Sequence, residues 1–233
     1  MLEPVSEGIW VASRSLRFFG VEIGARMTVV RLAGGGLFFH SPVALDAATR
    51  EAVDALGRVV AIVAPCRFHH LHVAEWARAY PDASVSACPG LDAKRPDVRW
   101  SRVLGDEVPP DAEWSGDLEQ VFFSAFPLQN EVVFFHRKTR TLVSSDIVFT
   151  LGRHPSALTR GIAWLSGNSE PGPTLLERFA IRDRGAAREQ IDRMVAWDAE
   201  RIVLAHGPIL AENGAAILEE GYRWLRRDHE PRS

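Results

Sequence analysis

The stretch that most constrains this chain is residues 61–76, AIVAPCRFHHLHVAEW. The continuous apolar run Val59–Val63 is typical of a strand covered on both faces, and it stops at Pro65. Three histidines follow within four positions, namely His69, His70 and His72. A helix is then predicted over Val73–Tyr80. A strand that ends in a histidine-rich turn before a helix places imidazoles at one edge of a sheet.

The composition is that of an ordinary globular protein. The chain has 233 residues, 46% of them hydrophobic and 24% charged, and it has no repeats or low-complexity linker. We therefore predict a single domain over residues 1–233. A formal charge of -3 and a pI of about 6.2 do not provide the basic face that nucleic-acid binding requires.

The same composition argues against a membrane protein. No apolar run approaches the ~20 residues that are needed to cross a bilayer. The first residues, MLEPVSEG, lack the basic and apolar regions of a signal peptide. A cytoplasmic location is therefore expected.

The chain contains two cysteines, Cys66 and Cys88. One disulfide would not form a scaffold in a chain of this size. We expect two reduced thiols, at least one of them in the core, because free cysteine is often buried. Cys66 lies three residues before the histidine cluster, which makes it the more interesting of the two.

Hydrophobic periodicity and turn residues predict mixed α and β structure along the whole chain. Strands are expected over 9–19, 26–33, 37–40, 59–63, 84–88, 118–126, 131–136, 141–145 and 201–205. Helices are expected over 46–56, 73–80, 186–200 and 213–226. Gly34–Gly36 is interpreted as a hairpin turn and not as a phosphate-binding loop, because a strand follows it.

Three further expectations concern the less regular parts of the chain. Residues 150–183 are predicted to be irregular, as a lid, an interface segment or a solvated connector. His136 is expected to face solvent at the end of a hairpin. The tail 226–233 is expected to be frayed.

The order of these elements resembles the metallo-β-lactamase fold, an α/β (α+β) architecture built as a four-layer αββα sandwich. The resemblance covers nearly the whole chain. It is carried by RMTVVRL…GLFFHSPV at Arg26–Val43, VAPCRFHHLHVAEW at Val63–Trp76, EVVFFHRKTRTLVSSDIVF at Glu131–Phe149 and VLAHGP at Val203–Pro208. Within that superfamily the chain is similar to the branch described as domain of unknown function 4336 (DUF4336).

Active members of that superfamily hold two metal ions through a His-x-His-x-Asp-His turn, a hairpin histidine, a bridging aspartate and a late histidine. The resemblance places Asp146 at the bridging aspartate and His206 at the late histidine. His70 or His69 takes the last histidine of the turn. The other ligand positions fall on Ala64/Pro65, Cys66/Arg67, Phe68/His69 and about Pro127, and His40 replaces a strand-end aspartate. At least three expected ligands are thus lost, which implies a degenerate metal site.

The candidate site is therefore one edge of the sandwich. Imidazole and carboxylate are ligands of zinc, and one open position can hold an activated water. The candidate metal ligands are His69, His70, His72, Asp146 and His206. The candidate residues beside them or in the pocket are His40, Cys66 and Glu75. His69 and His72 share a helix face and His70 points elsewhere, because consecutive residues diverge by ~100°.

Simpler roles stay open for two of these residues. Asp146 is also suited to cap the segment that follows it, since aspartate accepts hydrogen bonds from free backbone N–H groups. His206 is also suited to bond a backbone carbonyl.

Two functions of different classes follow. One is a hydrolase with at most one divalent metal, zinc or another ion, acting on an ester, a lactone or a similar small molecule. The other is a non-catalytic module that has lost the metal and binds a small molecule or a partner. Whether the protein is an enzyme, and whether it holds any metal, both stay open. Thiol chemistry through Cys66 and a neighbouring histidine is a third alternative.

The expected partner is an unidentified small molecule. Neither nucleic acid nor a membrane is expected, and a homodimer is an open alternative.

Overall fold

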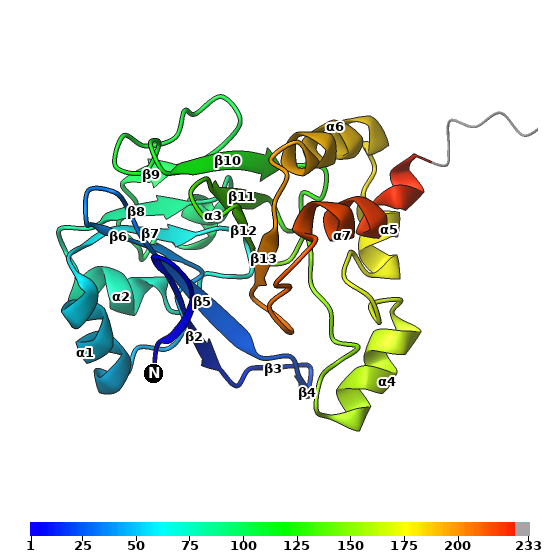
Figure 1. Ribbon diagram of the computed structural model, residues 1–233, viewed down its shortest axis with the longest axis horizontal. Helices are drawn as coiled ribbons and strands as arrows, with labels where there is room; N and C mark the ends of the chain where they lie inside the picture. Colours follow the sequence, from blue (N-terminus) through cyan, green and yellow to red (C-terminus); the bar gives the residue numbers. More distant parts are fainter. Residues whose placement is uncertain (227–233) are drawn as a thin grey trace, which may run out of the picture.

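The computed structural model describes residues 1–226, and the predicted frayed tail lies almost wholly outside the described residues. Two sheets form the centre of the molecule (Figure 1). The larger sheet runs in the order β1 (Glu3–Ser6), β2 (Ile9–Arg14), β5 (Ala25–Arg31), β6 (Leu37–His40), β7 (Val59–Ala64), β8 (Ser84–Ala87), β9 (Arg102–Val103). The smaller sheet runs β10 (Leu118–Phe123), β11 (Glu131–His136), β12 (Thr141–Ser144), β13 (Arg201–Leu204).

Helices cover the outer faces of both sheets. α1 (Ala47–Leu56) and α2 (Val73–Ala79) lie against the larger sheet, and α6 (Arg184–Val195) and α7 (Gly214–Gly221) lie against the smaller one (Figure 1). The remaining elements are α3 (Leu91–Lys94), α4 (Ala157–Leu165), α5 (Leu175–Ala180), a 3₁₀ turn (Arg223–Leu225) and the hairpin β3 (Arg17–Phe18)–β4 (Val21–Glu22). None of the helices within residues 1–226 combines the length and apolar character needed to cross a bilayer.

Alternate residues of β11 show how the layers are divided. All six of its residues are buried. Val132 and Phe134 pack into the core between the two sheets, whereas Val133 and Phe135 pack into the core beneath α6. Because successive side chains of a strand point to opposite faces, β11 lies between two apolar layers. The predicted αββα sandwich is confirmed.

The parallel strands determine where a site can form. β6, β7 and β8 are parallel neighbours in one sheet, and β12 and β13 are parallel neighbours in the other. The turns after β6, β7, β12 and β13 contain Ser41, Cys66, Asp146 and His206. Crevices at the carboxyl ends of strands are the usual binding places in α/β folds. The chain thus brings distant polar residues to one edge.

The structure differs from the sequence prediction in several places, and the longest of them is the segment 150–183. Residues 150–183 contain α4 and α5, and α5 begins with a capping box between Thr174 and Glu177, a signal that the glycines and prolines of this segment obscured. The strand predicted over 9–19 ends at Arg14, because Glu22 accepts hydrogen bonds from Ser15 Oγ and Leu16 N. The chain then forms the separate β3–β4 hairpin, in which Arg17 pairs with Glu22.

The prediction for His136 was wrong. Its side chain is buried, and its Nδ1 lies 2.8 Å from Thr139 Oγ1. The hairpin turn folds back over the ring and removes it from solvent. The single-domain assignment for residues 1–233 stays a prediction.

The aromatic cluster between the sheets predicts a large cost for truncating its centre. Phe134 is fully buried against Phe38, Trp114 and His40. F134A should lower the free energy of unfolding by about 3–5 kcal/mol, measured by urea denaturation. F19A removes a ring that is 92% exposed and should change it by less than about 0.5 kcal/mol. Equal effects of the two substitutions would contradict this assignment of the core.

Candidate metal centre

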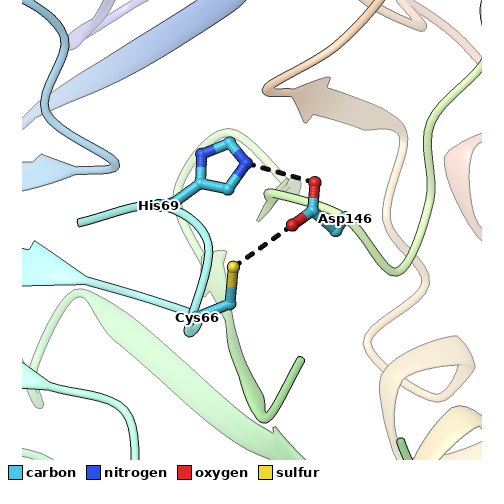
Figure 2. Close-up of side chains that lie close together, drawn as sticks. All are labelled: Cys66, His69 and Asp146. Atoms are coloured by element: carbon cyan, nitrogen blue, oxygen red, sulfur yellow. Dashed lines mark hydrogen bonds and ion pairs between the residues drawn. The ribbon is translucent and has the colours of Figure 1, made fainter. Parts of the chain in front are cut away.

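Four polar side chains from three separate turns meet at the edge of the sandwich. Cys66 and His69 follow β7, Asp146 follows β12 and His206 follows β13. His69 Nε2 lies 3.1 Å from Asp146 Oδ1 and 3.1 Å from His206 Nε2, and His206 Nε2 lies 3.3 Å from the same Oδ1. Figure 2 shows the side chains of Cys66, His69 and Asp146 pointing toward one another.

A hydrogen bond on the side of the ring away from the cluster fixes the orientation of His206. Its Nδ1 lies 2.7 Å from the Gly24 carbonyl oxygen, which can only accept a hydrogen bond. Nδ1 therefore carries the proton, and in the neutral ring Nε2 presents a lone pair to Asp146 and His69. His206 can therefore bond a backbone carbonyl and also act as a ligand, because Nδ1 serves the first role and Nε2 the second.

His69 is held in a similar way, but with a hydroxyl behind it. Its Nδ1 lies 2.5 Å from Ser41 Oγ, and its side chain is 8% exposed. Burial disfavours protonation of the ring, but the charge of Asp146 and the hydrogen bond to it outweigh burial and raise the pKa of His69. A positive charge at this point is therefore favoured by the carboxylate, whether a proton or a cation supplies it.

Asp146 is the centre of the cluster. Burial alone would raise its pKa, but His69 and His206 together hold the pKa of Asp146 well below its usual range. Its second oxygen, Oδ2, accepts a hydrogen bond of 3.2 Å from the Cys66 thiol. The carboxylate thus faces the two histidines with one oxygen and the thiol with the other.

Cys66 is fully buried, and its environment favours the thiol. Burial raises its pKa well above the usual value, and the charges of Asp146 and Glu131 raise it further. A thiol that acts as a nucleophile needs the opposite shift. The contacts of Cys66 therefore fit a hydrogen-bond donor to Asp146 better than a free nucleophile.

His40 lies beside the cluster, at the end of β6. Its side chain is 1% exposed, and burial followed by the charge of His69 lowers its pKa to about 3. Its Nε2 is buried without a hydrogen-bond partner among the described residues. A buried acceptor or donor left in this state is unusual in a native structure, and it marks a place where a further polar group would be stabilised.

His70 and His72 engage other partners. His70 Nδ1 lies 2.9 Å from Arg95 Nη1, a group that only donates. Burial, followed by the charges of Lys94 and Arg95, lowers the pKa of His70 to about 4. His72 Nδ1 lies 2.6 Å from Glu75 Oε1, which also lies 3.2 Å from Leu45 N. Metal ligation by His70 or His72, and a role of Glu75 beside the site, stay predictions without support from these contacts.

The course of the turn after β7 explains why His70 and His72 lie outside the cluster. Consecutive residues point in different directions, so only one of the adjacent pair His69 and His70 reaches Asp146. His72 is the N-cap residue of α2, and its side chain is 38% exposed. The shared face expected for His69 and His72 does not bring His72 into the cluster, because the segment before Val73 is not helical.

Three residues of the centre were not identified from the sequence. Glu131 is fully buried beneath Asp146, Ser41 contacts His69, and Gly24 contacts His206. A charged residue at the start of the otherwise apolar run EVVFF is a signal that could have drawn attention to Glu131. Nothing in the local sequence marks Ser41 or Gly24, because both act through long-range contacts.

The donor set fits a divalent cation. Cys66, His69 and Asp146 offer ligand atoms that all lie within 4.8 Å of one another. His206 adds a fourth donor within 3.3 Å of Asp146. Sulfur, imidazole nitrogen and carboxylate oxygen are all ligands of zinc. Acceptor atoms this close to one another are stable only when a proton or a cation lies among them.

Comparison with solved structures shows the class of fold. The chain has the metallo-β-lactamase fold: it superposes on DIM-1 metallo-β-lactamase with a TM-score of 0.65 at 15% identity, covering 98% of this chain and 97% of that one. A metallo-β-lactamase from Pontibacter korlensis gives 0.63 at 15% identity, with coverage of 97% and 98%. FIM-1 from Pseudomonas aeruginosa, in its mono-zinc form, gives 0.62 at 11% identity, with coverage of 99% and 96%.

Sequence comparison gives a narrower match. Residues 6–93, which include β7 and the His69 turn, match the family described as Domain of unknown function (DUF4336). No curated protein matches the sequence.

Burial of both thiols predicts slow reaction with disulfide reagents. Burial also raises the pKa of Cys88 to about 12. In chelator-treated C88S protein at pH 8, Cys66 should react far more slowly with a chromogenic disulfide in the folded protein than in protein unfolded by guanidinium. The reason is that Cys66 is neither ionised nor accessible in the folded protein. Native reaction as fast as that of free cysteine would instead favour the thiol chemistry considered above.

Proposed function

We propose that this chain is a metal-dependent hydrolase that holds one divalent ion, with zinc as the expected metal. His69, Asp146 and His206 are the ligands in this proposal, and Cys66 bonds Asp146 from the side. The substrate class is a small molecule with an ester, lactone or related acyl bond. The observation that carries the proposal is the convergence of His69 Nε2, Asp146 Oδ1 and His206 Nε2 within 3.1–3.3 Å.

The support for a cation comes from the atoms that face one another. His206 Nε2 presents a lone pair, and Asp146 Oδ1 is an acceptor. His69 and His206 each use Nδ1 to contact Ser41 and Gly24, respectively, so both rings direct Nε2 into the cluster. Three ligands with one open position are the arrangement of catalytic zinc sites.

Each residue has a defined role in the proposed chemistry. When bound, the ion would supply the Lewis acidity that activates water and polarises an acyl carbonyl. Ser41 and Gly24 orient the two imidazoles. Cys66 holds Asp146 Oδ2, which directs Oδ1 toward the histidines. The choice of an acyl substrate is supported by the fold, which this chain shares with β-lactamases at low identity.

The loss of the other expected ligands supports one ion and not two. Arg67 and Pro127 occupy or adjoin positions where the resemblance expects histidines. In the structure Arg67 Nη1 donates a hydrogen bond of 3.3 Å to the Pro127 carbonyl oxygen. A guanidinium offers no lone pair and repels a second dication.

A non-catalytic metal or ligand site is the second candidate, and burial favours it. The side chains of His69, Asp146 and His206 are only 8–11% exposed. If Cys66 were also a ligand, four protein donors would close the site, as in structural zinc sites. The state of Cys66 therefore separates the two candidates.

Metal binding is the first test. Chelator-treated protein should bind one equivalent of zinc, with a rise in melting temperature that EDTA reverses, because the ion binds only the folded state. H206A should lose most of this stabilisation. H72A is the matched control, since His72 is bonded to Glu75 and should leave zinc binding unchanged. No bound zinc, or equal losses in both variants, would refute the proposed site.

Cobalt substitution tests the number of ligands. The cobalt protein should show ligand-field bands without a thiolate charge-transfer band, because Cys66 donates to Asp146 Oδ2 in this proposal and is not a ligand. C66S should keep the metal, since a hydroxyl can donate to Asp146 in place of the thiol. The zinc-loaded wild type should hydrolyse members of an ester and lactone panel, and H206A should not. A strong thiolate band with no hydrolysis would favour the closed, non-catalytic site.

A further inference from the structure

Glu131 is a buried carboxylate that none of the chemistry above uses. It begins β11 and its side chain is 0% exposed. Burying a charged group is costly unless every oxygen is hydrogen-bonded. Five donors meet this need. Its Oε1 accepts from Ser144 Oγ (2.8 Å) and Ser145 N (2.6 Å), and its Oε2 accepts from Gln129 Nε2 (2.8 Å), Asp146 N (2.7 Å) and Ile147 N (2.8 Å).

Four of these donors belong to the segment that carries Asp146. Three of them are consecutive backbone N–H groups, which can only donate. Such a row of N–H groups around one anion forms a nest. The backbone of residues 145–147 is therefore tied to the carboxylate of a neighbouring strand, and it holds Asp146 in place without the help of a metal.

The charge of Glu131 reaches the same site. Burial raises the pKa of Glu131, and the charge of Asp146 raises it further, while the hydrogen bonds from the backbone N–H groups of the turn lower it. The charge of Glu131 also contributes to raising the pKa of His69. Both oxygens of Glu131 accept from backbone N–H groups, which can only donate, so this geometry favours the carboxylate, and its negative charge beneath Asp146 favours a positive charge at the cluster.

We propose that Glu131 is a positioning residue for the cation site, which fixes the turn that presents Asp146 and adds negative potential beneath it. This inference rests on the proposed function in one respect only, the presence of a bound cation. It assigns a role to a residue that does not touch the ion. Removal of such supporting groups usually weakens metal binding by about 10- to 100-fold.

The test compares zinc affinity, by competition with a chromophoric chelator, in four proteins. E131Q keeps the shape and removes the charge, and S144A removes one donor and keeps the charge. E119Q is a control that removes a half-buried carboxylate of β10, which pairs with Arg137. E131Q should bind zinc about 10- to 100-fold more weakly than wild type. S144A and E119Q should bind zinc nearly as tightly as wild type, whatever their melting temperatures.

A parallel measurement uses the wild type and does not depend on the folding of E131Q. Amide hydrogen exchange of residues 145–147 in chelator-treated protein should be as slow as that of β12, because Glu131 holds these N–H groups without metal. Fast exchange would overturn the positioning role. E131Q with wild-type zinc affinity would overturn the electrostatic role and leave the proposed function intact. A wild type that binds no zinc would refute the proposed function, while the exchange result still decides whether Glu131 holds the turn.

Discussion

Two carboxylates buried at a single turn govern the architecture of the candidate centre. Glu131 and Asp146 interact electrostatically, and burial opposes the ionisation of both. Glu131 is compensated by five hydrogen-bond donors, and Asp146 by two histidines and a thiol. The smaller sheet supplies both carboxylates and His206, and the turn after β7 of the larger sheet supplies His69 and Cys66. The site therefore exists only when the two sheets are packed together.

The late histidine is joined to the N-terminal strands by a second set of contacts. Arg26 on β5 donates through Nη1 to the carbonyls of Leu204 (2.6 Å) and Gly207 (2.9 Å). Gly207 has φ of +94°, and a β-carbon there would lie 2.2 Å from the Thr150 carbonyl oxygen. Only glycine fits this close approach. These contacts carry His206 toward Gly24, so that the turn after β13 and the segment before β5 together determine where its ring lies.

The parts of this structure that the sequence could predict are those determined locally. The apolar run of β7, the amphipathic helices and the strand-end positions of Asp146 and His206 follow from periodicity and from the family resemblance. The choice between His69 and His70 depends on the path of a non-helical turn, which periodicity does not describe. Ser41 and Gly24 act on residues 28 and 182 positions away in the chain, so no local pattern marks them, and Glu131 is marked only as a charged residue at the start of an apolar run.

The departure from a two-metal pattern has a simple electrostatic consequence. In the proposed centre, one dication would balance the negative charges of Asp146 and Glu131 at this edge of the sandwich. A second dication would have to approach Arg67, whose guanidinium is already bonded to the Pro127 carbonyl. Apolar residues such as Ala64 and Phe68 offer it no lone pairs in return. The same substitutions that remove ligands thus also remove the negative charge that would hold a second ion, and the proposed centre is limited to one.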